Sequence, residues 1–299
     1  MPPLYIVLVN YNGYEDTLEC INSLMKNSYT DFKVVVVDNA STDGSGQKLA
    51  QKFAGSKVVT VILNDDNLGF SGGNNVGISY SMQQGADLVV LLNNDTIAKK
   101  DFLESIARYY NKNRKKPILF TGKILYYYEP DRIWYGGGSY KYYKGSVVHR
   151  HFNEIDVGQC NSQEKINFIC GCLLCINRKA LNQIGLLPEE YFLYCEDTAY
   201  TLKAVENGID CYFEPSIVVY HKVSASTKRV SNLSAYYMIR NRAYLVRQHS
   251  KGMAKPIALL ATMYATLKGI LRHKYPLSVA GEAWRDYFRH RTGRYRAKG

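Results

Sequence analysis

The sequence predicts an α/β fold with a mostly parallel sheet flanked by helices, followed by a basic helical segment at the C-terminus. Over the first 121 residues, short runs rich in Val, Ile and Leu alternate with segments of helical periodicity. Such runs are typical of strands buried on both faces of a parallel sheet. Asn, Asp and Gly follow four of the runs, and the last quarter of the chain holds all of the excess positive charge.

The strand and helix patterns repeat in a strand–helix–strand order, which predicts a doubly wound unit. The expected strands are Leu4–Val9, Lys33–Val37, Val58–Leu63, Asp87–Leu92 and Pro117–Thr121. The expected helices are Glu15–Lys26, Gly44–Phe53, Gly73–Gln84 and Lys100–Asn113. In such sheets the ligand binds at the carboxyl ends of the strands, so the residues that follow each run are the candidate site.

The second half of the chain is less regular. From Lys123 to about Lys165 the periodicity is lost and tyrosines are frequent, which predicts either a functional loop or a short excursion of β structure. After it we expect two strands, two helices and then helices to the end of the chain: strands Asn167–Ile176 and Cys211–Glu214, helices Arg178–Ile184 and Glu196–Asn207, and a helical region from Asn232.

Composition excludes several classes of protein. The chain has 299 residues, of which 46% are hydrophobic and 21% charged, so it is not disordered, collagen-like or a disulfide-stapled miniprotein. Its seven cysteines are an odd number in mostly apolar surroundings, which predicts reduced thiols in a cytosolic protein. Neither a signal peptide nor a spanning helix is expected, because the run 4–9 is short and the run 256–267 falls below the about 20 residues required.

The distribution of charge points to an anionic partner. Residues 1–221 hold 21 Lys and Arg against 24 Asp and Glu, whereas residues 222–299 hold 17 against 2. A segment of this kind binds nucleic acid or an anionic membrane surface. We expect no nucleic acid, because base stacking requires aromatic residues within a basic groove and most of the tyrosines lie in the weakly acidic part.

Two of the predicted strand ends carry candidate nucleoside contacts. Asp38 directly follows four valines, and its carboxylate can accept hydrogen bonds from a base or a ribose hydroxyl. Asn10 and Tyr11, after the first strand, would complete the pocket. The alternative is that Asp38 and Asn39 only cap a turn into the next helix.

Two further strand ends are suited to a diphosphate. Asp95 ends the sequence Asn93-Asn94-Asp95, and a carboxylate there can hold Mg²⁺ or Mn²⁺; the alternative is a cap for the following helix. The glycine-rich segment Asn67–Asn75 matches neither GxGxxG nor a P-loop, but its glycines allow close approach of a ligand. A plain tight turn is the alternative for that segment.

Asp197 and His221 are the remaining candidates. The pair Glu196-Asp197 opens a helix after an aromatic run, where a carboxylate of raised pKa could act as a general base. An ordinary acidic first turn is the alternative. His221 follows the strand-like run Ile217–Tyr220 and is either a metal ligand or a structural histidine.

Taken together, these segments resemble the inverting family 2 glycosyltransferases, which have a GT-A fold, and in particular the bacterial branch that transfers rhamnose or similar sugars to surface polysaccharides. The matching segments occur in the family's order over about residues 4–250: Val9–Asn12, Val36–Gly44, Asn67–Phe70, Leu91–Asp95, Phe192–Asp197 and His221.

The resemblance implies a role for each candidate. Asp197 would be the catalytic base, and Asp95 with His221 would bind Mg²⁺ or Mn²⁺. The implied donor-binding residues are Asn10, Tyr11, Asp38, Asn67, Gly73, Asn94 and Asp95. The chain departs from the family at Asn93, where the metal motif usually begins with Asp, and at Ala199, where many relatives have an acidic residue; Lys203 can serve as the basic residue found later in that helix.

The resemblance also implies an activity. We expect inverting transfer of a sugar, first rhamnose from dTDP-rhamnose, to a lipid-linked or polysaccharide acceptor of the cell surface. The alternatives are a galactofuranosyl-, galactosyl- or glucosyltransferase that uses a UDP-sugar, or a partner subunit that has lost catalysis.

The same reasoning predicts the domain organisation. Residues 1–225 would form the GT-A domain, with 123–165 as an acceptor-side insertion, and residues 226–299 a basic helical segment. Aromatic residues and cations alternate in that segment, as in helices that lie on a membrane surface. We therefore expect peripheral attachment to the inner face of the cytoplasmic membrane; the alternative is a helical cap that mediates homodimerisation.

Overall fold

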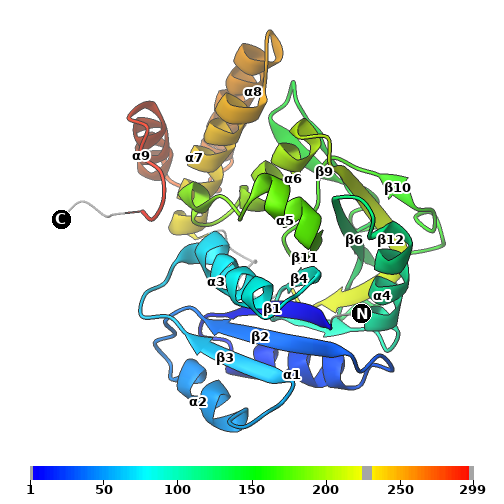
Figure 1. The fold of residues 1–299 in the computed structure, drawn as a ribbon. Helices are drawn as coiled ribbons and strands as arrows, with labels where there is room; N and C mark the ends of the chain where they lie inside the picture. The colour runs from blue at the N-terminus through cyan, green and yellow to red at the C-terminus, as the bar shows by residue number, and fades with distance from the viewer. Residues whose placement is uncertain (1–2, 224–230, 296–299) are drawn as a thin grey trace.

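One large mixed sheet runs through the middle of the molecule, with helices on both sides (Figure 1). The computed structural model describes residues 3–223 and 231–295. Within them the main strands lie in the order β10 (Glu164–Lys165), β12 (Asp210–His221), β6 (Ile118–Tyr126), β11 (Leu173–Asn177), β4 (Leu88–Leu92), β1 (Leu4–Asn10), β2 (Phe32–Asp38) and β3 (Val59–Leu63). The short strands β5 (Thr96–Ala98) and β7 (Ile133–Tyr135) pair with β12 and β6, and β8 (Gly138–Lys141) forms a separate hairpin with β9 (Ser146–His149).

The predicted mostly parallel sheet is confirmed. Strands β4, β1, β2 and β3 are parallel neighbours, as are β6 and β12, whereas β11 runs antiparallel between β4 and β6. The four valines Val34–Val37 are fully buried, because helices cover both faces of β2.

The helices that flank the sheet follow the predicted segments to within a few residues. They are α1 (Tyr14–Met25), α2 (Ser45–Lys52), α3 (Gly69–Gln83), α4 (Phe102–Asn113), α5 (Arg178–Ile184) and α6 (Glu196–Glu206), with a short 3₁₀ turn η1 (Glu189–Tyr191). The prediction for α3 was wrong at its start, which lies four residues before Gly73, so most of the glycine-rich segment is helix rather than loop. Gly73 and Gly77 face β1 there, where a Cβ would contact Val9 and Val7 at 3.0 and 2.3 Å.

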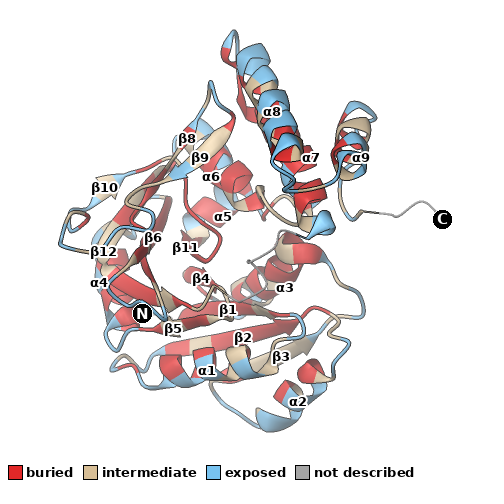
Figure 2. Ribbon diagram, turned by 180° about the vertical axis from the view of Figure 1, so that it is seen from behind, coloured by how far each residue is buried: buried red, intermediate tan, exposed pale blue. Residues whose placement is uncertain are grey.

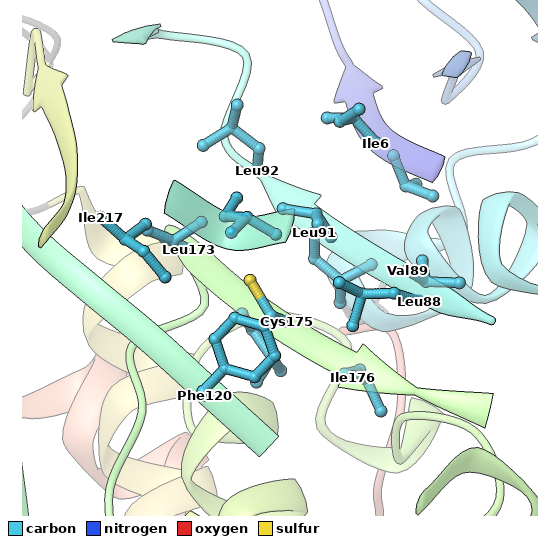
Figure 3. Close-up of a cluster of buried hydrophobic side chains, with 14 of the residues drawn as sticks. Ile6, Leu88, Val89, Leu91, Leu92, Phe120, Leu173, Cys175, Ile176 and Ile217 are labelled. Carbon is cyan, nitrogen blue, oxygen red and sulfur yellow. The ribbon is translucent and has the colours of Figure 1, made fainter. Parts of the chain in front are cut away.

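The centre of the core lies where β4, β11 and β6 meet. Figure 3 shows Leu91, Cys175 and Phe120 packed together, and all three are inaccessible to solvent. Each Å² of apolar surface removed from water contributes about 25 cal/mol, so this cluster is a main source of the stability of the fold. All seven cysteines have free thiols, and only Cys195 is partly exposed.

Three predicted boundaries were wrong, each because a strand is fixed by its neighbours. Strand β6 continues to Tyr126 through pairing with β12, so regular structure is not lost at Lys123. Strand β11 begins only at Leu173. Before it, the side-chain oxygen of Asn167 accepts a hydrogen bond from the backbone nitrogen of Tyr140, in place of backbone pairing with a strand. Strand β12 runs from Asp210 to His221 and joins the predicted short strand to the following apolar run.

The tyrosine-rich insertion contains β7 to β10, so it has the β structure that was one of the two predicted alternatives. Tyr135 is completely buried, and its hydroxyl donates to the carbonyl oxygen of Phe168 at 2.6 Å. The buried ammonium of Lys123 is 2.6 Å from a carboxylate oxygen of Asp156. These contacts fix the insertion against the sheet.

The C-terminal segment is helical, as predicted. Its helices are α7 (Asn232–His249), α8 (Ala254–Leu271) and α9 (Leu277–Phe288), and α8 projects away from the sheet (Figure 1). The predicted domain boundary at 225/226 lies outside the described residues. Within the described ranges, no helix is long and apolar enough to cross a membrane.

Candidate active site

Asn10 and Asp38 lie side by side at the carboxyl ends of β1 and β2. The amide of Asn10 donates to Oδ1 of Asp38 at 2.6 Å and to the hydroxyl of Ser45 at 2.9 Å. Its own oxygen accepts from the hydroxyl of Thr17 at 2.8 Å. Asn10 is completely buried, so it orients the carboxylate of Asp38 from behind.

The carboxylate of Asp38 also holds the turn that follows β2. It accepts hydrogen bonds from the backbone nitrogen and the hydroxyl of Ser41, at 3.0 and 2.6 Å. A Cβ on Gly46 would lie 2.4 Å from this carboxylate, so only glycine fits there. Asp38 therefore does stabilise the turn, which was the alternative role expected for it. Tyr11, whose side chain is 49% exposed, stands next to this site.

Asn39, which the sequence analysis did not select, organises the segment before α3. Its amide nitrogen donates to Oδ1 of Asn67 at 3.1 Å and to the carbonyl oxygen of Gly69 at 2.9 Å. Its oxygen accepts from the backbone nitrogen of Leu68. Asn67 is thereby turned towards the protein, where it shapes the loop. The position of Asn39 directly after the buried strand β2 could have indicated that it organises this segment.

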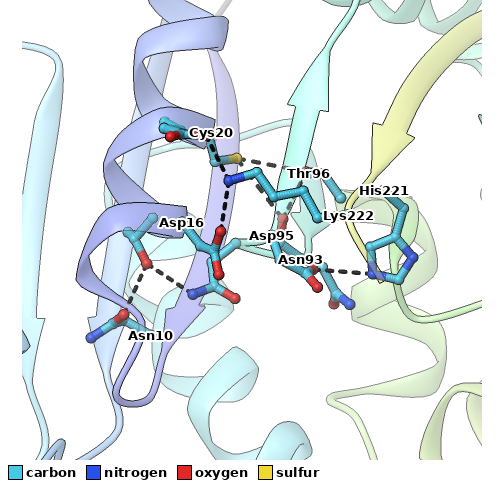
Figure 4. Close-up of polar contacts among 11 residues, drawn as sticks. Asn10, Asp16, Cys20, Asn93, Asp95, Thr96, His221 and Lys222 are labelled. Carbon is cyan, nitrogen blue, oxygen red and sulfur yellow. Dashed lines mark hydrogen bonds and ion pairs between the residues drawn. The ribbon is translucent and has the colours of Figure 1, made fainter. Parts of the chain in front are cut away.

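Asp95 and His221 meet at the end of β4. Oδ1 of Asp95 lies 3.1 Å from Nε2 of His221, and both side chains are largely buried (Figure 4). The contact exists because β5 pairs with β12, with Thr96 opposite His221. Asp95 does not cap the next helix, since Asp101 holds that position. The side-chain nitrogen of the neighbouring Asn94 donates to the hydroxyl of Thr17 at 2.9 Å.

The pair suits a metal ion whose other ligands come from a substrate. Among the described residues, no group of three or more His, Cys, Asp and Glu is arranged to hold a metal. Nδ1 of His221 is buried and has no hydrogen-bond partner in the described part of the chain. Mg²⁺ and Mn²⁺ are commonly bound by one or two carboxylates plus phosphate oxygens and water; the carboxylate of Asp95 fits that pattern, and His221 would add one nitrogen donor.

Lys222 follows His221 and ties β12 to α1. Its ammonium lies 2.6 Å from carboxylate oxygens of both Asp16 and Glu19 (Figure 4). The strand end that carries His221 is therefore anchored on the side of α1. No local pattern marks this lysine, because its partners are more than 200 positions away.

Asp197 lies in the first turn of α6 and accepts three hydrogen bonds. The backbone nitrogen of Gly171 donates to its Oδ2 at 2.8 Å, and the backbone nitrogen and hydroxyl of Thr198 donate to its Oδ1 at 2.5 and 3.1 Å. Burial raises the pKa of Asp197, and these hydrogen bonds oppose the rise. The carboxylate is therefore buried and yet stabilised in its charged form.

Glu196 differs from its neighbour. Burial and the charge of Asp197 raise the pKa of the Glu196 carboxyl, and its Oε2 has no partner among the described residues. Since the hydrogen-bond donors surround Asp197, the pair at neutral pH carries its negative charge on Asp197 and keeps Glu196 protonated.

A short segment links Asp197 to the Asp95–His221 pair. Gly171 donates to Asp197, and the next residue, Cys172, accepts a hydrogen bond at 2.9 Å from the backbone nitrogen of Asn93. Through Gly171 and Cys172, one short segment thus contacts both the Asp197 carboxylate and the backbone at the end of β4, beside Asp95.

The loop before Asp197 is strained and held from two sides. Phe192, Tyr194 and Cys195 have positive φ angles of 64°, 67° and 72°, which cost energy in residues other than glycine. On one side, the backbone nitrogen of Phe70 donates to the carbonyl oxygen of Phe192 at 2.8 Å. A Cβ on Gly69 would lie 2.3 Å from that oxygen.

On the other side the loop is held by α7. The amide of Asn241 donates to the carbonyl oxygens of Tyr191, Leu193 and Tyr194 at 2.8–2.9 Å, and Arg240 donates to that of Tyr191 at 3.3 Å. Both side chains are buried. From the sequence we expected this helix to contact a membrane or a second subunit, and not this loop; two adjacent polar residues in an aromatic helix were the available signal.

Comparison with protein families identifies the chain. The family model described as "Glycosyl transferase family 2" matches residues 5–185, which is more than half of its length. The chain belongs to glycosyl transferase family 2. The matched region includes the ends of β1, β2 and β4, where Asn10, Asp38 and Asp95 lie. The family expected from the sequence motifs is confirmed.

Two curated relatives of this glycosyltransferase are named for the transfer of rhamnose or for glycan biosynthesis. The dTDP-rhamnosyl transferase RfbF of Shigella flexneri is 24% identical over 259 residues, which are 82% of this chain and 80% of the relative. The low-salt glycan biosynthesis hexosyltransferase Agl10 of Haloferax volcanii is 26% identical over 253 residues, 80% of this chain and 74% of the relative.

Solved structures confirm the GT-A fold. The S. aureus TarS fragment 1–349 matches 97% of this chain and 81% of its own at 19% identity, with a TM-score of 0.55. The mannosyltransferase PcManGT from Pyrobaculum calidifontis, solved with GDP-Man and Mn²⁺, matches 95% of this chain and 79% of its own at 15% identity, with a TM-score of 0.57.

Proposed function

We propose that this glycosyltransferase moves a sugar from a nucleoside diphosphate donor to an acceptor hydroxyl, with inversion of the anomeric centre. The observation that carries the proposal is the link through Gly171 and Cys172 between the Asp197 carboxylate and the Asp95–His221 pair. In-line attack needs a base on one side of the anomeric carbon and charge neutralisation on the other. The segment Gly171–Cys172 contacts the Asp197 carboxylate and the backbone at the end of β4, which supports this division of tasks.

Asp197 is the proposed base. Its carboxylate takes the proton from the acceptor hydroxyl, and the resulting oxygen attacks the anomeric carbon while the bond to the diphosphate breaks. Burial makes the carboxylate more basic than one in water, and the hydrogen bonds from Gly171 and Thr198 fix its direction. Three donors leave it enough charge at neutral pH to accept the proton.

The donor is proposed to lie along the ends of β1, β2 and β4. Asp38, oriented by Asn10, accepts hydrogen bonds from the base or ribose, and the exposed ring of Tyr11 stacks on the nucleoside. Asn67 and Gly73 act indirectly, by shaping the loop and packing α3 on the sheet. Asp95 and His221 would hold Mg²⁺ or Mn²⁺, which neutralises the charge that develops on the leaving diphosphate.

We propose dTDP-rhamnose as the donor, supported by the name of the RfbF relative and by a second relative, the rhamnosyltransferase WbbL of E. coli K12, which is 22% identical over 73% of this chain and 83% of its own. A UDP-sugar is the second candidate, favoured by the likeness to TarS, which has been solved with UDP-GlcNAc. The acceptor is proposed to be lipid-linked or a growing polysaccharide of the cell surface.

We further propose that the enzyme works in the cytoplasm, on the inner face of the membrane. Helix α8 exposes an apolar stripe at a spacing of three and four residues, formed by Met253, Ile257, Leu260, Tyr264, Leu267 and Leu271. Figure 2 shows this helix exposed along much of its length. Cations beside such a stripe are typical of interfacial helices. Pairing of two copies through the same stripe is the alternative.

A thermal-shift screen of thymidine and uridine diphosphates and their sugars, with and without Mn²⁺, tests the donor site. We expect a metal-dependent rise in melting temperature for one nucleotide that Asp95→Ala abolishes. Asp197→Asn should keep that rise and lose transfer, whereas Glu104→Gln, an acidic residue in the first turn of α4, should change neither. Loss of both donor binding and transfer in Asp197→Asn would contradict its role as a base.

A further inference from the structure

A cavity of about 480 Å³ lies between the start of α6, the β8–β9 hairpin and helices α7 and α8. Its volume is within the range of about 300–1,000 Å³ that is usual for ligand sites. The walls are mainly apolar, with side chains from three separate parts of the chain: Val147, Ala235, Met238, Ile239, Leu245 and Ala265. Neither the donor-binding residues nor the Asp95–His221 pair contributes to this lining.

Four cations line the same cavity, and we call them the cationic rim: Arg242, Lys268, Arg272 and Lys274. None of the described side chains around the cavity is acidic, and the ion pairs found in the described part of the chain include none of the four. Arg242 is half-buried, and among the residues that the structure describes it donates to two carbonyl oxygens, those of Gly145 and Lys144, at 2.8 Å. Uncompensated cations around an apolar space attract an anionic ligand.

The cavity adjoins the proposed base. Cys195 and Thr198 form part of its wall, and the hydroxyl of Thr198 donates to Oδ1 of Asp197 at 3.1 Å. A molecule seated in the cavity therefore approaches the reacting carboxylate from the side of α7, away from the ends of β1 and β2 that hold the donor.

Helix α8 separates the cavity from the exposed apolar stripe. Ala265, Thr266 and Gly269 face the cavity, whereas Leu260 and Leu267, on the other side of the helix, are 66% and 53% exposed. If the stripe rests on a membrane, the cavity lies at the level where the phosphate of a lipid meets its apolar chain.

We propose that this cavity is part of the acceptor subsite and binds the carrier of the acceptor, a phosphate on an apolar chain, with the chain on the apolar walls, the phosphate on the cationic rim and the acceptor hydroxyl towards Asp197. The inference rests on the proposed function and specifies its acceptor. An oligosaccharide without an apolar chain would leave the apolar part of these walls uncovered. An apolar molecule without charge would leave the four cations without an anion.

Titration calorimetry with farnesyl diphosphate on the full chain tests this inference, in EDTA so that no divalent ion holds the diphosphate at Asp95. Ala265→Trp fills the cavity, and Ala261→Trp places the same side chain on α8 outside the lining. Lys268→Gln with Arg272→Gln removes two rim charges, and Lys251→Gln with Lys255→Gln removes two exposed charges near the start of α8. The rim variant alters exposed side chains, so it retains the fold.

We expect the cavity and rim variants to bind farnesyl diphosphate about tenfold or more weakly, as for loss of a charged hydrogen bond, and both controls to bind like the unmodified chain. Farnesol and inorganic pyrophosphate should each bind more weakly than the whole molecule. Equal binding by the rim variant and its control, equal binding by either fragment, or no binding to the unmodified chain would overturn the inference.

Donor binding, measured on the same samples with Mn²⁺, separates the two proposals. If the nucleotide binds and farnesyl diphosphate does not, the cavity assignment is wrong and the proposed donor chemistry stands. If farnesyl diphosphate binds and no nucleotide does, the proposed function is contradicted, whereas the ligand class of the cavity is supported.

Discussion

The side-chain amide of Asn241 lies 2.9 Å from the carbonyl oxygen of Tyr194, three residues before Asp197. The same amide reaches the carbonyl oxygens of Tyr191 and Leu193, so one side chain of α7 fixes a loop that contains three residues of positive φ. Strain of this kind persists only where neighbouring structure enforces it. Asn241 is therefore a positioning residue for the proposed base.

Replacing Asn241 should affect turnover more than donor binding. Asn241→Ala removes the donors to the loop, and a displaced carboxylate lowers the rate of attack; we expect kcat to fall by about a hundredfold with the dissociation constant of the nucleotide unchanged. Steady-state kinetics and nucleotide titration check this. Asn232→Ala, the same change at an exposed position of α7, is the control. A parallel loss of nucleotide binding would indicate general unfolding instead.

Because the carboxyl of Glu196 is buried, we expect the free energy of unfolding to depend on pH. Burial first, and then the charge of Asp197, raise the pKa of Glu196 from 4.5 to about 8. The folded chain then holds a proton that the unfolded chain has released, so stability falls as pH rises from about 4.5 to about 8. Glu196→Gln should be more stable than the unmodified chain by on the order of 1–3 kcal/mol at about pH 9 and similar to it at about pH 4.5.

Denaturant unfolding of the two proteins at both pH values measures this difference. Asp197 remains in both proteins, so its own titration largely cancels in the comparison. A variant that is less stable at the higher pH would show that the ionised carboxylate of Glu196 is favoured in the folded state.

Gly46 offers a test of Asp38 that leaves Asp38 in place. In Gly46→Ala the added Cβ would lie 2.4 Å from the carboxylate and would push it out of its contacts with Asn10 and Ser41. We expect nucleotide affinity to fall about tenfold, as for loss of one charged hydrogen bond. Gly281→Ala in α9 is the control, because its Cβ would meet no atom within 4 Å. Equal affinity in both variants would remove Asp38 from the donor site.

The apolar stripe of α8 predicts binding to membranes. Leu260→Glu with Leu267→Glu places two charges on the face proposed to enter the headgroup region, and we expect this variant to lose flotation with vesicles that contain phosphatidylglycerol. Val157→Glu, at an exposed apolar residue of the insertion, should float like the unmodified chain. If the stripe instead joins two copies, the α8 variant changes oligomeric state in sedimentation and keeps its flotation.

Much of the donor half of the fold can be predicted from the sequence. Strands β1 to β4 and the polar residues after them are encoded in short contiguous patterns: a buried strand is an apolar run, and the residues that follow it lie at the edge of the sheet. Asn10 and Asp38 were found in this way. Asp197 and His221 were also selected, but the pattern left each with a structural alternative, and resemblance to the family decided between the two.

The remaining features were decided by tertiary structure. Strand β11 enters between β4 and β6 in the opposite direction, β5 brings Asp95 to His221, and Asn241 reaches the loop before Asp197. Each of these contacts joins residues that are tens of positions apart or more. The sequence by itself determined the family, the strands and the groups at their ends, because those follow from local pattern. Which groups meet was decided only by long-range pairing and packing, whose free energy depends on all of the elements at once.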